Sequence, residues 1–91
     1  MSPSEKFQQE IMDLVHKRYP KAMRGDIGEN TEAAAALATA LGGLLAFAFR
    51  LNGEVIGRTV LQTIVHEIVE NAAAIDEKNG AIIRNAFPKP N

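Results

Sequence analysis

The sequence predicts an all-α fold with helices at about residues 3–19, 31–51 and 55–78, followed by an extended C-terminal tail. In each segment, apolar residues recur every three or four positions, as they do on the buried face of a helix. Proline or an Asn-Gly pair separates the segments. The middle segment is apolar around nearly its whole circumference, which is typical of a helix enclosed on all sides. We therefore expect one domain, residues 1–91, that assembles as a dimeric helical bundle.

Size and composition limit how such a chain can be stabilised. It has 91 residues, of which 46% are hydrophobic, and it contains no cysteine. A chain this short buries only about 60–65% of its unfolded surface, so its own core is marginal. Without cysteine there are no disulfides and no thiolate metal sites, so partner subunits become the expected support.

The charge balance argues against several classes of partner. Ten Lys and Arg residues face eleven Asp and Glu residues, so no overall field favours nucleic acid or an anionic membrane. Residues 1–10 have no basic-then-apolar signal pattern. We expect a cytoplasmic protein.

The first helix has clear boundary signals. Ser2 is a suitable N-cap, Pro3 fits the first helical position and Glu5 completes a capping box. Pro20 ends the helix at or before Tyr19. Between these limits an apolar stripe comprises Phe7, Ile11, Leu14 and Val15, so we expect this amphipathic helix to cover another element.

The second helix is expected to begin after a connecting loop, residues 20–30, with Asn30 or Thr31 as its N-cap. It should stop at Asn52-Gly53, where Gly53 can adopt the left-handed conformation that ends helices.

This second helix has two distinct apolar faces. One is a broad arc of large side chains: Leu37, Leu41, Leu44, Leu45, Phe47 and Leu51. The other, which we call the small-residue seam, comprises Ala35, Thr39, Gly42, Gly43 and Ala46. Each glycine inside a helix costs about 1 kcal/mol relative to alanine, so the pair needs a compensating role. Close approach of another backbone along the seam is the preferred interpretation, and a kink or break at Gly42-Gly43 is the alternative.

The uncharged stretch 33–49 within this helix is the one candidate for a membrane span. It is shorter than the ~20 strongly apolar residues that a bilayer requires, and much of it is Ala and Gly. Glu32 and Arg50 bracket it closely. We interpret it as a buried helix of a soluble protein and do not expect membrane association.

The third helix is expected to end at Asn79-Gly80. Together with the second helix it should form a long antiparallel hairpin, with the first helix lying across it. The prolines of the tail, Pro88 and Pro90, prevent a regular helix at its end.

Self-association follows from this arrangement. Two neighbouring helices of one chain cannot surround the second helix, whereas two copies of the hairpin can. A twofold homodimer is the expected assembly, with a tetramer as the alternative.

Few residues are candidates for chemistry. His66 and Glu70 lie one turn apart and could share a metal, but the motif resembling a zinc helix lacks its second histidine, and a solvated pair is the simpler interpretation. Asp13 and His16 have a ligand spacing without the other carboxylates that a di-iron site needs. A basic cluster comprises Lys17, Arg18, Lys21 and Arg24.

The basic cluster complements the dipole at the end of the first helix, and alternatively it could contact phosphates. No serine or histidine has a partner that would make it a catalytic nucleophile or base, so we expect neither an enzyme nor a cofactor. The leading hypothesis is a non-enzymatic, homo-oligomeric module for protein–protein interaction. The alternatives are a small nucleic-acid-associated regulator and a metal- or small-ligand-binding bundle, and we expect nucleic acid to be the less favoured partner.

Overall fold

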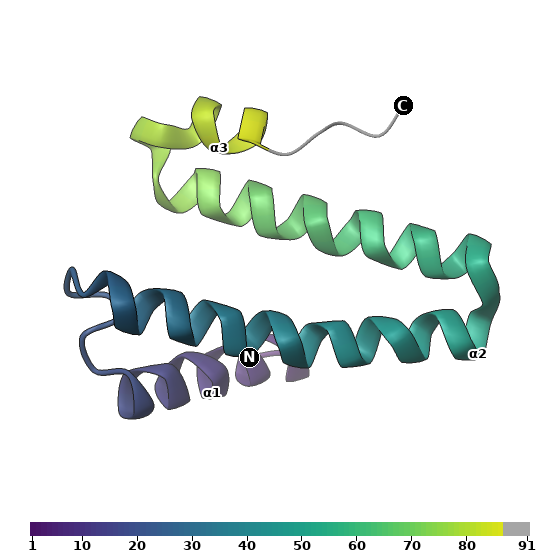
Figure 1. The fold of residues 1–91 in the computed structure, drawn as a ribbon, viewed down its shortest axis with the longest axis horizontal. Coiled ribbons are helices and arrows are strands. Elements are labelled where there is room, and N and C mark those ends of the chain that lie inside the picture. Colours follow the sequence, from purple (N-terminus) through teal and green to yellow (C-terminus); the bar gives the residue numbers. More distant parts are fainter. Residues whose placement is uncertain (87–91) are drawn as a thin grey trace. The chain divides into compact units, whose positions relative to one another are not determined.

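The structure, a computed structural model, describes residues 1–86, which are mostly helical (87%) and contain no strand. Helix α1 spans Pro3–Arg18 and α2 spans Ile27–Ile75; a 3-10 turn, η1, spans Glu77–Asn79, and α3 spans Gly80–Ala86 (Figure 1). The chain comprises two units, Met1–Gly43 and Leu44–Asn91, and the boundary between them falls within the sequence of α2. The predicted all-α class is confirmed.

Helix α1 begins with the predicted capping box. The Glu5 backbone N–H donates to the Ser2 hydroxyl at 3.1 Å, and the Ser2 N–H donates to the Glu5 carboxylate at 3.3 Å. These reciprocal bonds satisfy two donors that the first turn of a helix otherwise leaves unpaired. The helix ends at Arg18 with Tyr19 as its C-cap, one residue before the predicted end.

Helix α2 begins earlier than predicted, at Ile27, and its cap is Asp26 rather than Asn30 or Thr31. The Glu29 backbone N–H donates to the Asp26 carboxylate at 2.9 Å, which is the usual N-cap bond. The Asn30 side chain instead donates to the Ala22 carbonyl at 3.0 Å. The prediction was wrong here because three suitable capping residues lie close together and the sequence pattern does not rank them.

Within α2 one residue alone has a non-helical backbone: Gly53, at φ 83° and ψ 179°. The predicted boundary at Asn52-Gly53 is therefore confirmed, and the expected helices 31–51 and 55–78 correspond to the two arms of α2, residues 27–52 and 54–75. Gly42 and Gly43 are helical. The alternative interpretation of this pair, a break in the helix, is wrong.

A close contact lies beside the turn at Gly53, which is at the right of Figure 1. The ring of Phe49 lies against Gly57, so near that a Cβ at residue 57 would be 2.6 Å from ring carbons. Gly57 is buried. Glycine is needed here because any other side chain would displace the ring.

The C-terminal segment is also different from the prediction. Helix α2 ends at Ile75, and Asp76 caps η1 by accepting a bond from the Asn79 backbone N–H. Gly80 is right-handed helical, at φ −54° and ψ −45°, and it begins α3 instead of ending a helix. The expectation of an extended tail is therefore wrong for residues 81–86, whereas Pro88 and Pro90 lie outside the described residues.

Close packing explains the position of α3. A Cβ at Gly80 would be 3.4 Å from the Ala73 carbonyl oxygen, and both residues are buried. The small residue at position 80 thus lets the start of α3 approach the last turns of α2. This contact is tertiary, and local propensity gives no sign of it.

The Phe49–Gly57 contact predicts a non-additive pair of substitutions. Alanine at Gly57 gains about 1 kcal/mol of helix propensity but overpacks against the ring, at a cost of about 1–3 kcal/mol. In the wild-type chain we expect Gly57→Ala to lower the free energy of unfolding. In a chain that already carries Phe49→Ala, we expect the same substitution to raise the free energy of unfolding by about 1 kcal/mol. Urea unfolding followed by circular dichroism measures both. If Gly57→Ala changes the free energy of unfolding equally with Phe49 and with alanine at position 49, the ring does not pack against Gly57.

Candidate interaction surface

Very little apolar surface is buried by either unit. The buried hydrophobic residues are Ala22 and Ala33 in the first unit and Val69 and Ala73 in the second. Three of these four are alanines, and α1 has no buried residue. Within residues 1–86, neither unit therefore has the large interdigitated side chains that normally form a hydrophobic core.

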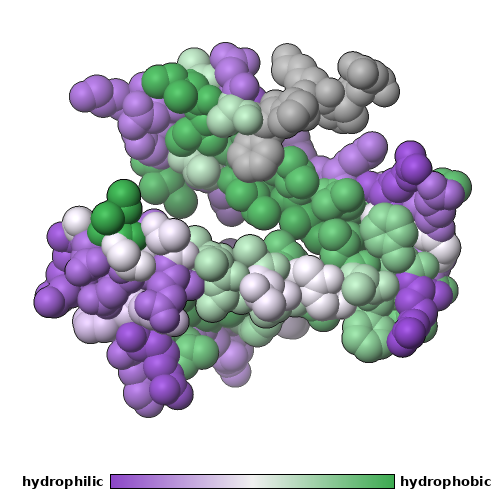
Figure 2. Space-filling view, viewed as in Figure 1, coloured by the Kyte–Doolittle hydropathy of each residue, from purple (hydrophilic) through white to green (hydrophobic). Residues whose placement is uncertain are grey.

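Large apolar side chains are instead exposed along the whole described chain. Phe7 is 61% exposed, Leu44 68%, Phe47 57% and Leu51 76%. Others are Met12, Leu14, Leu37, Val55, Ile56, Leu61, Ile68, Ile75 and Ile82. A side chain exposed in the complete chain is at least as exposed in its own unit, so these values are lower bounds for each unit alone. Figure 2 shows such residues in green along the visible face of α2.

The small-residue seam is open to solvent. All five of its members, Ala35, Thr39, Gly42, Gly43 and Ala46, are exposed. At 100° per residue four of them fall within an arc of about 60°, and Gly43 flanks that arc. In the first unit, a Cβ built at Gly42 or Gly43 has no neighbouring atom within 4 Å. The seam is thus smooth and uncovered.

The one polar side chain of the seam is already satisfied. The Thr39 hydroxyl donates to the Ala35 carbonyl of its own helix at 3.0 Å. Thr59 and Thr63, on the second arm of α2, form the same type of bond with Val55 and Thr59 carbonyls. Because burying an unpaired hydroxyl is unfavourable, this internal bond allows the seam to be covered without a polar partner.

The large-residue arc lies on the opposite side of the helix from the seam. Leu41 and Leu45 are half-buried, whereas Leu37 and Leu44 are exposed. A shallow hollow beside the seam is lined by Ala46, Phe47 and Arg50. The helix therefore presents apolar surface on two sides.

Among residues 1–86, His66 and Glu70 are not joined by a third candidate metal ligand. Glu70 pairs with Arg84 of α3, whose Nη2 and Nε lie 3.1 Å and 3.2 Å from Oε2. This hydrogen bond lowers the pKa of Glu70 below its ordinary 4.5; burial opposes the shift, and the charges of Arg84 and His66 add to it. Among residues 1–86 no group of three His, Asp or Glu side chains is placed to hold a metal. The carboxylate that we had considered as a ligand is instead part of an ion pair.

The second pair of candidate ligands lies on α1. Asp13 accepts a hydrogen bond from the Gln9 side chain at 2.9 Å, and both residues are exposed. His16 is also exposed.

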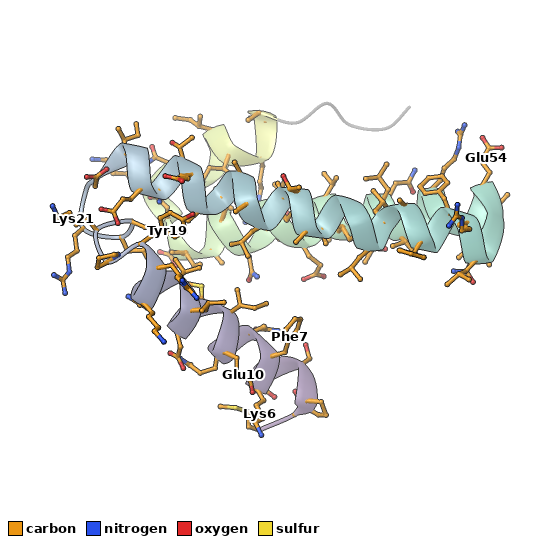
Figure 3. The ribbon with its side chains drawn as sticks, turned by 60° about the horizontal axis from the view of Figure 1, so that its bottom comes forward. Lys6, Phe7, Glu10, Tyr19, Lys21 and Glu54 are labelled. Atoms are coloured by element: carbon orange, nitrogen blue, oxygen red, sulfur yellow. The ribbon has the colours of Figure 1, made fainter. Side chains whose placement is uncertain are left out.

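The basic cluster lies at the end of α1 and on the following loop. Lys17, Arg18, Lys21 and Arg24 are all exposed, and Figure 3 shows Lys21 on this loop. Acidic residues fix the same loop: Glu29 accepts a bond from the Lys21 backbone N–H at 3.2 Å, and Asp26 caps α2. These carboxylates reduce the local positive field that phosphate binding requires.

Two contacts within the second unit were not predicted from the sequence. Glu70 and Arg84 are fourteen positions apart and lie on different helices, so no periodicity connects them. Phe49 and Gly57 had a detectable signal, because each lies four residues from Gly53 and a reversal there brings them together.

Comparison with protein-family models, curated proteins and solved structures finds no match to this chain. By length and composition, α2 is apolar enough to cross a membrane, a test that the core helices of soluble proteins also pass.

The Glu70–Arg84 pair predicts that the attachment of α3 depends on pH. Because the folded pKa of Glu70 is lowered, its stabilising effect is present above the ordinary value and is lost as the pH falls through the folded value. We expect the protection factors of the residue 80–86 amides, which compare their exchange rates with those of unprotected amides at the same pH, to fall on acidification below the ordinary value of 4.5. Glu70→Gln should lower these protection factors at neutral pH already.

Glu67→Gln is the matched control, since Glu67 is an exposed carboxylate on the same arm. It should leave the acid transition unchanged. An identical transition in the Glu70→Gln variant would show that another group causes it.

Proposed function

We propose that the protein is a non-enzymatic, homo-oligomeric helical module that acts through protein–protein interaction. The observation that carries this proposal is the exposure of large apolar side chains over both units, with only small patches buried. Burying a Leu, Ile or Phe side chain contributes about 1.5–3 kcal/mol, so covering even a few of them is a strong drive to associate.

In the proposed assembly the two arms of α2 form an antiparallel hairpin, and two hairpins pair about a twofold axis. The small-residue seams of the two copies lie against each other, because only a surface without large side chains lets helix backbones approach closely. The internal Thr39–Ala35 bond supports this choice, since it leaves no unpaired hydroxyl in the contact. The opposite arc of leucines then packs within the hairpin.

A second copy is the favoured partner on electrostatic grounds. The net charge is −1, so two copies repel each other very little. Isologous twofold dimers are also the commonest soluble oligomers.

The distribution of charge favours a cytoplasmic assembly over insertion into a membrane. The second arm of α2 has a polar face that includes Arg58, His66, Glu67 and Glu70, and α1 has charged residues along its length. Charged side chains within a bilayer are costly unless they are paired or face water. An apolar first arm covered by amphipathic helices requires no bilayer.

The seam makes a prediction whose sign distinguishes a dimer from a monomer. In an uncovered helix, Gly42→Leu should raise the free energy of unfolding by up to about 1 kcal/mol, because leucine is a better helix former. If the seam packs against a second copy, the same substitution should lower that free energy by about 1–3 kcal/mol and reduce the mass in solution. We expect the second result, measured by chemical unfolding and light scattering.

Ala40→Leu is the matched control for this substitution. Residue 40 is an exposed alanine of the same helix that lies outside the seam, on the side of the leucine arc. It should leave the mass unchanged. If Ala40→Leu lowers the mass in solution and Gly42→Leu does not, the contact between copies lies on the leucine arc instead of the seam.

Association also predicts that stability depends on protein concentration. Since folding and dimerisation are linked, raising the total concentration tenfold should move the urea midpoint to a higher urea concentration, by the amount of urea that offsets about 1.4 kcal/mol of unfolding free energy per dimer. Unfolding curves recorded at several concentrations test this. A midpoint that does not change with concentration would argue against the proposed function.

A further inference from the structure

The turn within α2 carries an inference that rests on the proposed self-association. Gly53 is the only non-helical residue among the 49 residues of α2, and both flanking residues are helical. Its φ of 83° with an extended ψ belongs to a backbone region that is essentially restricted to glycine. Rotation at this one residue would convert α2 into a continuous helix of about 73 Å.

Polar bonds near the turn do not oppose this rotation. The Asn52 side chain donates to the Ala48 carbonyl, and Glu54 pairs with Arg58 at 2.6 Å. Each bond joins residues of the same helical arm at i and i+4, so each persists when the turn straightens. The Glu70–Arg84 pair likewise lies entirely beyond the turn.

One contact at the turn would be lost. In a continuous helix residues 49 and 57 are eight positions apart, about 12 Å along the axis, so the Phe49 ring could not lie against Gly57. The ring and the glycine surface it covers would both be exposed. The Gly57 of a second straightened chain presents the same surface, so the contact can re-form between copies.

We propose that Gly53 is a hinge through which two copies exchange their C-terminal arms, residues 54–86. In the closed form Phe49 packs on Gly57 of its own chain; in the exchanged form it packs on Gly57 of the second copy. Exchange of identical elements preserves the native contacts, so the balance depends on the backbone at the hinge and on protein concentration. Gly53 favours the closed form because glycine tolerates the turn and is a poor helix former.

The absence of cysteine allows a direct test. Phe49→Cys and Gly57→Cys are introduced together, and the folded protein is oxidised and resolved by denaturing electrophoresis without reductant. A disulfide within one chain reports the closed form, and a two-chain band reports exchange. We expect mainly single-chain product after refolding at low concentration, and a larger two-chain fraction after refolding at high concentration.

Adding Gly53→Ala should raise the ratio of two-chain to single-chain product at least tenfold, because alanine is strained in the turn and favours the helix. Asn52→Ala is the control, since residue 52 is helical in both forms and the ratio should stay unchanged. If Gly53→Ala stays folded and dimeric yet gives only single-chain product, the hinge proposal is wrong.

A second measurement keeps Phe49 and Gly57 intact. Spin labels at Leu44→Cys and Gln62→Cys, in a chain diluted with excess unlabelled protein, should be about 27 Å apart along a straightened helix. Gly53→Ala should increase the population at that separation, and no change would overturn the proposal. A monomeric mass would refute the proposed function itself, whereas a dimer with closed chains would refute only the hinge.

Discussion

An apolar helix has to be surrounded on all sides, and the described part of this chain has too few helical segments to surround the first arm of α2. The remaining features follow from that shortage. Among residues 1–86, burial is confined to four small or medium side chains, while leucine and phenylalanine side chains remain exposed in both units. In the proposed assembly a second copy supplies the missing cover, and this is our explanation for two adjacent glycines within a helix of a chain without disulfides.

Local interactions determine where each helix begins and ends, and they do not depend on that cover. Ser2 with Glu5 begins α1, Asp26 begins α2, and Asp76 marks the change from α2 to η1. The backbone of Gly53 separates the two arms of α2. The ends of the helices are thus determined by contacts within one chain. In the proposed assembly, the packing of the helices is completed by contacts between two chains.

The sequence was sufficient for the helical class, the capping box and the break at Gly53, because each depends on residues within one or two turns. It was not sufficient for the start of α2, where several adjacent residues can act as caps. Helix α3 was also missed, since it depends on the close approach of Gly80 to Ala73 and on the pairing of Arg84 with Glu70. Both are contacts between segments that no periodic pattern connects. For the candidate site, the sequence was sufficient to identify the residues of the seam. It was not sufficient to predict that all of them are exposed to solvent in the single chain.

The central claim is that one chain cannot bury its apolar surface alone. Size-exclusion chromatography with light scattering, over a hundredfold range of concentration, tests it most directly. The account predicts a mass of twice the 9.9 kDa of the chain, or a higher even multiple, that falls only on strong dilution. A mass of 9.9 kDa at every concentration, with the helices intact, would contradict it.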